Sequence, residues 1–412
     1  TGRLEIRSAT IEKLIEAMTH EKYGDLGVRP SVIMTYNSFT TPHDFLTKIF
    51  DRFQVPIPMN MSKREREYFI EEKQKRIQLK VISLLKYWFQ EQVCDFCSDK
   101  TLRELFENKM HEIKSCYQHG SILKPLNRSL IEFQLKVEGF DIAVENDIPR
   151  EPTILPRKVF TLSDLRQTGI YFLSPVEVAR QLSLLDFSVF RKIKPYECLR
   201  HAWTRSDRLQ RAPHLVAISN RFNKLARWTS TCILVNRKKS DAFQRAEYFI
   251  RLITECLKLN NINSAYAIYS GMSCTPVYRL NKTIFKQLSR DTARQWKSIG
   301  ELFALENNRM RLRSRQRSLP SPAIPALAIF QNDLLHTEEG MADKRTNGCI
   351  NFSKCQQLAK TIERIRHYTQ KPYPFLKVGS IYDFFSDIKH LSHLNEDELY
   401  ECSYCLEKPP QF

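Results

Sequence analysis

The stretch "IPALAIFQNDLLHTEEG", residues 324–340, decides how the rest of this chain is interpreted. It begins with apolar residues, continues with an aspartate and two leucines, and ends with two adjacent glutamates before a glycine. Leu335 and Glu339 are four residues apart, so on a helix they share one face, one turn from each other. A local cluster of acidic and apolar residues stands out in a chain whose formal net charge is +18.

The composition predicts a helical chain with more than one domain. Its 412 residues exceed the size of one ordinary domain and favour two or three. The hydrophobic content of 42% is ample for buried cores. Only 11 glycines and no internal repeat argue against a β-rich or solenoid architecture, so we expect an all-α fold.

The charge predicts an acidic partner surface. Lys and Arg number 64 against 46 Asp and Glu, which suits nucleic acid, anionic lipid or an acidic protein. No run approaches the roughly 18 apolar residues of a membrane span, and residues 1–30 lack the apolar region of a signal peptide. We therefore expect a soluble chain.

The eleven cysteines lack the spacing of a small disulfide-bonded domain, which favours free thiols in a reducing compartment. Two pairs have C-x-x-C spacing, Cys94/Cys97 and Cys402/Cys405, and together would offer four thiolates to zinc. Each pair lies in a helical pattern without the Gly-rich turns that such sites use. We expect half-buried cysteines on helix faces and no metal.

The amino-terminal region has clear helix signals. Thr10 precedes an apolar repeat at helix spacing, and Thr41, Pro42 and Asp44 have the residue types that begin a helix. A third helix is indicated in "RIQLKVISLLKYWFQEQ", residues 76–92. These patterns predict a small helical domain over residues 1–118.

The helical pattern fades after this domain and then returns. "SILKPLNRSL" and a following segment with Pro149, Pro152 and Pro156 predict a connector without helices over residues 119–170. Helical periodicity is regained in stretches such as "QRAEYFIRLITECLKL", residues 244–259, with Ser240 or Asp241 as the expected cap. A second, larger helical domain is predicted over residues 171–408.

The motifs of covalent catalysis are absent from the sequence. It has no phosphate-binding loop, no dinucleotide-binding fingerprint, no H-E-x-x-H and no G-x-S-x-G. If the chain is a catalyst, we expect no covalent bond chemistry and no cofactor. The run "NNRMRLRSRQRSLP", residues 307–320, scatters its arginines around a helix, so we interpret it as a solvated loop. Contact with an anionic lipid, a phosphate or a nucleic acid is the alternative.

Three stretches occur in a fixed order: "PVEVARQLSLLDFSVFRKIKPYECLRHAW" at 175–203, "LNNINSAYAIYSGMSCTPVYRL" at 259–280, and residues 324–340 followed by "INFSK" at 350–354. This ordered set, within residues 171–408, resembles the catalytic domain of the Ras-family guanine-nucleotide exchange factors (RasGEF). In addition, "IEKLIEAMTH" followed by "IMTYNSFTTPHDFLTKIFDRF" resembles the Ras exchanger motif (REM) domain that precedes it in most of the family.

The resemblance implies a helical REM domain packed against a larger helical catalytic domain with a protruding helical hairpin. In the family this hairpin opens the first switch segment of a small GTPase, and the nucleotide-free GTPase is bound in preference. By resemblance, Leu335 brings apolar bulk to the Mg²⁺ site, and Glu339 offers a carboxylate to the Ser and Lys that the phosphate vacates. These two are the expected catalytic residues.

The resemblance also implies contacts around this pair. The expected GTPase contacts on the same helix are Asn332, Asp333, His336 and Glu338. Asn260 and Asn261 match a family position where an amide helps hold the second switch, and a helix cap or turn is the alternative for either. The expected supports of the hairpin are Tyr278, Arg279, Asn351, Phe352 and Lys354.

The chain departs from the family pattern near the hairpin. Cys355, Gln356 and Gln357 stand where basic residues usually continue "INFSK", which puts in doubt a salt bridge from that helix to the GTPase. Gln331 replaces an apolar residue, Ala328 a common Gly, and residues 341–342 the usual Asn-Pro. These departures motivate an alternative function, a non-catalytic GTPase-binding scaffold with the RasGEF fold.

The expected partner is a Ras-subfamily GTPase of the Ras, Rap or Ral type. The net charge of +18 also predicts attraction to an anionic membrane surface, whereas nucleic acid is not an expected partner. We expect the chain to be cytoplasmic and to be recruited to the inner face of membranes, where such GTPases are usually anchored by lipid.

Overall fold

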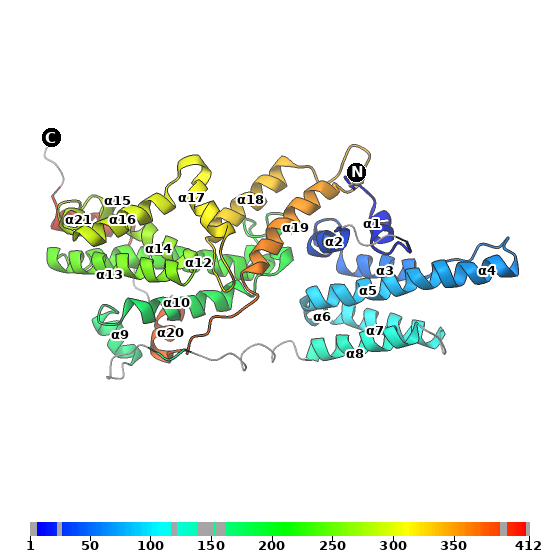
Figure 1. The fold of residues 1–412 in the computed structure, drawn as a ribbon. Helices are drawn as coiled ribbons and strands as arrows, with labels where there is room; N and C mark the ends of the chain where they lie inside the picture. Colours follow the sequence, from blue (N-terminus) through cyan, green and yellow to red (C-terminus); the bar gives the residue numbers. More distant parts are fainter. Residues whose placement is uncertain are drawn as a thin grey trace. The chain divides into compact units, whose positions relative to one another are not determined.

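The computed structural model describes residues 6–22, 27–116, 122–138, 151–153, 161–387 and 394–408. Within these ranges every named element is a helix, and β pairing is limited to isolated bridges (Figure 1). The prediction of an all-α fold is therefore confirmed. The chain divides into two compact units.

The first unit contains α1–α8 together with Leu199–His201 and Leu334–Ile362. Its helices are α1 (Ile11–Met18), α2 (Val28–Thr35), α3 (Pro42–Phe53), α4 (Lys63–Phe69), α5 (Lys75–Glu91), α6 (Val93–Ser98), α7 (Lys100–Cys116) and α8 (Leu123–Glu138), with a 3-10 turn at Tyr36–Ser38 and a π-helical turn at Ile70–Gln74. The predicted caps are in place, since the side chains of Thr10 and Thr41 accept hydrogen bonds from the backbone of Lys13 and Asp44.

Aromatic side chains form the centre of the first unit's core. Tyr36, Phe45 and Trp88 are fully buried, with ring centroids 5.0 to 5.2 Å apart. The buried carboxylate of Asp95 accepts hydrogen bonds from the Tyr36 hydroxyl at 2.5 Å and from Trp88 Nε1 at 3.1 Å. These bonds satisfy the polar atoms that two of the aromatic rings bring into the core.

The connector prediction for residues 119–170 is wrong in part, because α8 and a further helix, α9 (Leu162–Thr168), lie inside it. Pro125 falls in the first turn of this helix, where its missing N–H leaves no helical hydrogen bond unmade. Leu126, Leu130 and Phe133 recur at helix spacing and are buried in the core. Residues 139–150 and 154–160, which include Pro149 and Pro156, lie outside the described residues, as do residues 1–5.

The second unit contains the remaining helices, except for the end of α18 and the start of α19. They are α9 (Leu162–Thr168), α10 (Pro175–Phe190), α11 (Arg208–Arg211), α12 (Pro213–Leu234), α13 (Lys239–Lys258), α14 (Ile262–Met272), α15 (Thr275–Tyr278), α16 (Arg290–Phe303), α17 (Glu306–Arg317), α18 (Leu327–Gly340), α19 (Phe352–His367), α20 (Gly379–Ser386) and α21 (Glu396–Leu406), with 3-10 turns at Pro195–Cys198 and Phe285–Gln287. The connected ends of α18 and α19 belong to the first unit. Figure 1 shows α12, α13 and α14 side by side.

The helices α12 and α14 approach each other closely at Gly271. A Cβ added to this glycine would lie 2.9 Å from Cβ of Thr229 and against the backbone carbonyl of Ala226. A nearby ionic group ties α10 to α12, because Asp186 accepts hydrogen bonds from Nε and Nη2 of Arg221 at 2.9 and 2.7 Å. Both side chains are buried, so the charges are matched inside the unit.

The arginine run is helical from Met310 to Arg317 and not the predicted solvated loop, whereas Asn307, Asn308 and Arg309 before it have left-handed backbone angles. Arg309 stacks on the ring of Tyr266 and donates to its hydroxyl, with 5.3 Å between the guanidinium carbon and the ring centroid. Arg311 pairs with Glu301 at 2.7 Å, and Arg313 pairs with Asp333 at 2.8 Å. These arginines therefore take part in packing and ion pairs, whereas the sequence pattern alone predicted that they are solvated.

Two smaller sequence expectations are also resolved. The helix expected to be capped at Ser240 or Asp241 begins at Lys239 with Lys238 as its cap, so the cap lies two or three residues earlier than expected. Cys94 and Cys97 are half-buried on α6 as expected, whereas on α21 Cys402 is buried and Cys405 is exposed; all four are free thiols. In the part of the chain that the structure describes, no three His, Cys, Asp or Glu side chains gather into a metal-binding group. None of the described helices is both long and apolar enough to cross a bilayer.

Candidate functional site

Helix α18 has one continuous exposed face. Ala328, Asn332, His336 and Glu339 are exposed, and Leu335 beside them is half-buried. Steps of four, four and three residues keep these positions on one side of a helix. The face joins an apolar side chain to a carboxylate one turn away, which is the arrangement expected for the catalytic pair.

The opposite side of α18 packs into the chain. Phe330 and Leu334 are each 1% exposed. Asp333 is half-buried and pairs with Arg313 on α17 at 2.8 Å. Glu338 is buried and pairs with Lys354 on α19 at 2.7 Å. Glu338 therefore has little exposed surface to offer a GTPase, and Asp333 is already held in an ion pair; the GTPase contacts of both residues stay predictions.

The start of α19 is packed into the first unit. Phe352 is fully buried in the core of the first unit, together with Ile350 and Cys355. Burial raises the pKa of the Cys355 thiol to about 11, so this side chain stays neutral. Asn351 donates from its side chain to the carbonyl of Ala342 at 2.8 Å and so closes the turn between the helices.

The two asparagines at the turn between α13 and α14 differ in role. Asn260 is half-buried in a left-handed conformation with φ 59°, and its carbonyl accepts a hydrogen bond from the backbone N–H of Ile324 at 3.0 Å. Asn261 is fully buried, caps α14 by accepting from the N–H of Ser264 at 3.0 Å, and donates to Ser183 at 3.3 Å. The prediction of a GTPase contact is wrong for Asn261, and the helix-cap alternative is confirmed.

Tyr278 and Arg279 do not have the predicted surroundings. Tyr278 is 64% exposed at the end of α15. Arg279 donates to the carbonyl and hydroxyl of Ser403 at 3.1 and 2.9 Å and lies over the ring of Tyr404 on α21. The prediction of buried hairpin supports is therefore wrong for both, because Arg279 instead holds α21.

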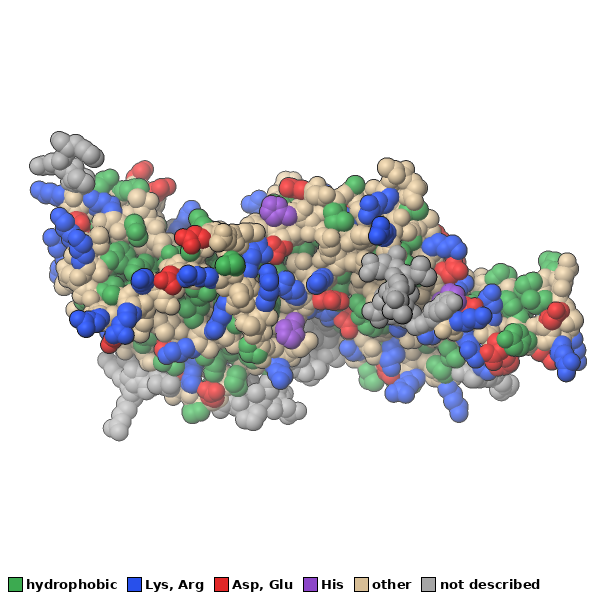
Figure 2. All heavy atoms as spheres, turned by 45° about the horizontal axis from the view of Figure 1, so that its top comes forward, with side chains coloured by type: hydrophobic (Ala, Val, Ile, Leu, Met, Phe, Trp, Pro, Cys, Tyr) green, Lys and Arg blue, Asp and Glu red, His purple; other side chains and the backbone are tan. Residues whose placement is uncertain are grey.

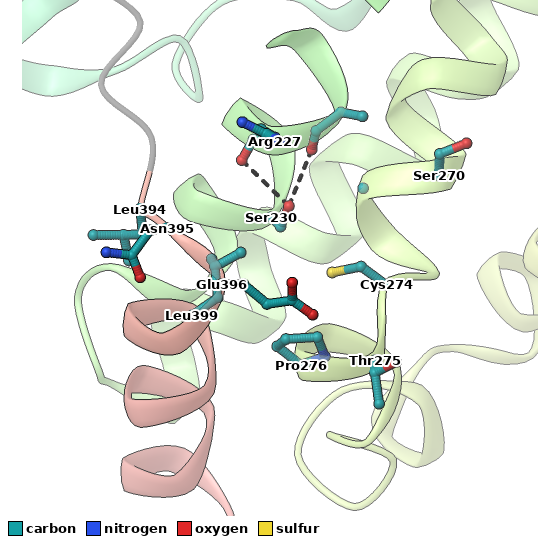
Figure 3. Close-up of a pocket in the computed structure, with 12 residues that line it drawn as sticks. Arg227, Ser230, Ser270, Cys274, Thr275, Pro276, Leu394, Asn395, Glu396 and Leu399 are labelled. Atoms are coloured by element: carbon teal, nitrogen blue, oxygen red, sulfur yellow. Dashed lines mark hydrogen bonds between the residues drawn. The ribbon is translucent and has the colours of Figure 1, made fainter. Parts of the chain in front are cut away.

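A cavity of about 430 Å³ lies where α12, α14, α15 and α21 meet (Figure 3). Figure 3 shows the Glu396 carboxylate and the Cys274 thiol pointing into it from opposite sides. Burial raises the pKa of Cys274, which makes this thiol a weak nucleophile. The rest of the lining combines Arg227, Asn395 and hydroxyl groups with apolar side chains.

The sequence reasoning missed two residues beside the hairpin. Asp343 contacts Lys354 at 2.6 Å, and the backbone N–H of Arg200 donates to Glu338 at 2.7 Å. Asp343 follows the glutamate pair closely in the sequence, and this nearness is the signal that could have identified it. Arg200 contributes a backbone group in a left-handed conformation, which no residue-type pattern announces.

Comparison with known families now adds to this geometry. The sequence model described as the RasGEF domain matches residues 177–356, and the one described as the RasGEF N-terminal motif matches residues 5–109. The chain belongs to the RasGEF family. The match to the RasGEF domain contains the whole of α18, the turn after it and the start of α19, so the exposed face lies inside it.

Curated RasGEF relatives align with nearly the whole chain. Ras guanine nucleotide exchange factor P of Dictyostelium discoideum is 29% identical over 394 residues, which is 93% of this chain and 25% of that protein. Ras guanine nucleotide exchange factor A of the same organism is 28% identical, over 98% of this chain and 66% of that protein. Protein son of sevenless of Drosophila melanogaster is 25% identical, over 97% and 26%. The chain thus spans from 25% to 66% of the length of these relatives.

Proposed function

We propose that this RasGEF chain accelerates GDP release from a Ras-subfamily GTPase by inserting the hairpin of α18 and α19 beside the GTPase's first switch. The observation that carries the proposal is the continuous exposed face of α18, in which Leu335 and Glu339 lie one turn apart. Because the other side of α18 is packed and ion-paired, this face is presented by a fixed helix.

The chemistry of the pair suits a site that holds Mg²⁺ and phosphate. A divalent ion needs oxygen ligands, so the apolar Leu335 side chain disfavours Mg²⁺ wherever it lies close to the ion's position. The Glu339 carboxylate replaces phosphate as the partner of the GTPase's Lys and Ser, and its charge repels the phosphate that leaves. Both effects favour the nucleotide-free GTPase, which is the requirement for catalysed release.

Asn332 and His336 are proposed to contact the GTPase beside the pair, because they share the exposed face. A half-buried Asn260 is proposed as a further contact. The expected partners are GTPases of the Ras, Rap or Ral type. The hairpin makes no covalent bond in this scheme, so its effect is measured as a rate of nucleotide release.

One observation favours a second function, that of a GTPase-binding scaffold without exchange activity. Gln356 and Gln357 are exposed on α19, where the family usually has basic residues. A neutral surface there removes charge-assisted contacts to an acidic GTPase surface. The scaffold would bind the loaded and the empty GTPase equally well.

The experiment that tests the proposal measures release of a fluorescent GDP analogue from Ras, Rap, Ral and Rho type GTPases. Wild type is compared with Leu335→Ala and Glu339→Ala. The matched controls are Leu209→Ala on α11 and Glu67→Ala on α4, which remove exposed side chains of the same types elsewhere. We expect acceleration of at least one Ras-subfamily member, reduced about tenfold or more in the two α18 variants and unchanged in the controls.

Equal losses in the controls would contradict a role for the α18 face. No acceleration of any GTPase, with binding that ignores the nucleotide state, would replace exchange with the scaffold function. We also infer that an anionic membrane attracts the chain, since its net charge is +18.

A further inference from the structure

Lys354 is a buried cation at the base of the hairpin. Lys354 lies near the start of α19, and only 4% of the residue is exposed to solvent. The ammonium group lies 2.7 Å from Oε2 of Glu338, 3.1 Å from the backbone carbonyl of Glu338 and 2.6 Å from Oδ1 of Asp343. A lysine has three N–H donors, so these three acceptors use its whole hydrogen-bonding capacity. We call Lys354, Glu338 and Asp343 the Lys354 cluster.

The second carboxylate oxygen of Glu338 is also bonded. The backbone N–H of Arg200 donates to Oε1 at 2.7 Å, and Arg200 has a φ of 54°. The Lys354 cluster therefore joins the last turn of α18, the turn that follows it, α19 and the segment Leu199–His201, all of which belong to the first unit. The Glu338 side chain has no freedom to turn outward without breaking these bonds.

The position of Lys354 is itself fixed by its neighbours. Phe352 and Cys355, on either side of it in sequence, are buried in the core of the first unit. Asn351 donates from its backbone to the carbonyl of Asp343 at 2.9 Å and from its side chain to the carbonyl of Ala342 at 2.8 Å. Arg345 Nε donates to the side-chain oxygen of Asn351 at 3.1 Å. The start of α19 is thus a fixed point next to the end of α18.

The charge balance of the cluster depends on Lys354. Burial acts to lower the pKa of the Lys354 ammonium, but the hydrogen bonds to Asp343 and Glu338 outweigh it, and the pKa is raised. The lysine is therefore charged at neutral pH. Without it, two carboxylates would share a partly dry site with no cation between them, which favours outward rotation of one of them.

We propose that Lys354 is a positioning residue that holds Glu338 inward and thereby directs Glu339 outward on the face of α18. Successive residues of a helix point about 100° apart, so an inward Glu338 fixes the direction of its neighbour. This inference rests on the proposed function for its catalytic consequence. The two adjacent glutamates then have different roles, since Glu338 sets the orientation of the end of α18 and Glu339 contacts the GTPase.

The test compares Lys354→Met with Lys360→Met, which removes the charge of an exposed lysine on the same helix. The first readout is hydrogen exchange of the backbone amides of residues 334–343 in the chain without a GTPase. The second is the rate of GDP release, separated into kcat and KM for the GTPase. We expect Lys354→Met to raise amide exchange in this segment and to lower kcat, each by about tenfold or more, with little change in KM. Lys360→Met should match wild type.

Two conservative variants separate positioning from general stability. Lys354→Arg keeps the positive charge and should retain most of kcat, whereas Glu338→Gln should show the same direction of change as Lys354→Met. If Lys354→Met does not fold, Glu338→Gln provides the same two readouts. Unchanged amide exchange and kcat in the variants would overturn the proposal. Faster exchange spread evenly over the first unit would also overturn it, because the role would then be structural alone.

The hydrogen-exchange readout needs no GTPase, which keeps the two proposals separable. Faster amide exchange at residues 334–343 in a chain that accelerates no GTPase, even as wild type, would overturn the proposed function. It would still support Lys354 as the residue that positions the end of α18.

Discussion

Glu338 and Glu339 are identical in side chain and adjacent in sequence, yet their surroundings differ. Glu338 is 9% exposed and bonded to Lys354 and Arg200, whereas Glu339 is exposed on the open face of α18. A carboxylate in the first setting stabilises the fold, and one in the second is available to a partner. Residue type alone does not assign these roles.

The two glutamates should separate stability from activity. Glu338→Gln should lower the free energy of unfolding by about 1–3 kcal/mol, because Lys354 keeps only Asp343 as a charged partner. Glu339→Gln should change stability by less than about 0.5 kcal/mol and should lower the rate of nucleotide exchange. Denaturant unfolding measures the first effect and GDP release the second. Glu67→Gln is the control, and equal stability of all three variants would contradict the assignment.

The Lys354 cluster should respond to pH only in the alkaline range. The folded-state pKa of Lys354 is raised above its ordinary value of 10.5, so its stabilising contribution is complete below that value. The contribution is lost as the pH rises through the folded-state pKa. The difference in unfolding free energy between wild type and Lys354→Met should therefore be constant from about pH 7 to about pH 9 and should shrink above about pH 10.5. A difference that already falls between pH 7 and pH 9 would argue against a charged Lys354.

At the scale of the helix, the sequence predicted the features that follow from the regular spacing of residues along a helix. The helices expected after Thr41 and over residues 76–92 are present as α3 and α5, and the four-residue spacing of Leu335 and Glu339 places them on a common face of α18. The helix α8 was missed because Pro125 and the prolines that follow were interpreted as breaking the whole segment. Whether a proline ends or begins a helix depends on its position in the first turn.

The site was harder to predict because its contacts join distant segments. Asn261 is buried against Ser183, 78 residues away in sequence. Glu338 is bonded to the backbone of Arg200, 138 residues away. Resemblance indicated which helix carries the candidate site, but the inward or outward direction of each side chain depends on these tertiary neighbours. Tyr278 and Arg279 were misassigned for the same reason.

The contact between α12 and α14 gives a prediction at the scale of a helix pair. Gly271→Ala should lower stability by about 1–3 kcal/mol, since the added methyl group meets Thr229 and the carbonyl of Ala226. Thermal unfolding measures the loss. Gly300→Ala on α16 is the matched control, because its new methyl would have only the Tyr269 hydroxyl nearby, at 3.8 Å. There we expect a gain of about 0.5–1 kcal/mol from helix propensity, and equal shifts in both variants would contradict the close approach.

At the scale of the whole molecule, positive charge is widespread. Figure 2 shows Lys and Arg side chains over much of the visible surface, with Asp and Glu among them. The face in this view therefore has charge of both signs and no single concentrated stripe of positive charge. The arginines of α17 add less to the positive charge than their number suggests, because Arg309 and Arg313 are used in packing and an ion pair.

The chain should therefore bind anionic vesicles weakly and in a salt-dependent way. Each suitably placed basic residue contributes roughly 1 kcal/mol near an anionic surface. We expect co-sedimentation with phosphatidylserine vesicles at low salt, loss of binding at about 0.5 M salt, and no binding to phosphatidylcholine vesicles. Binding that is insensitive to salt would contradict an electrostatic origin.

The buried residues at the start of α19 have a consequence for folding during translation. Ile350, Phe352 and Cys355 share one core with Ile15 and Val32. A ribosome adds about 5–20 residues per second, so the segment that completes this core emerges on the order of tens of seconds after the helices it covers. Until that segment has been made, apolar surface of those helices stays exposed to water and is available to chaperones. The helices α1 and α2 are thus made long before α19, yet their core is complete only after α19 has been made.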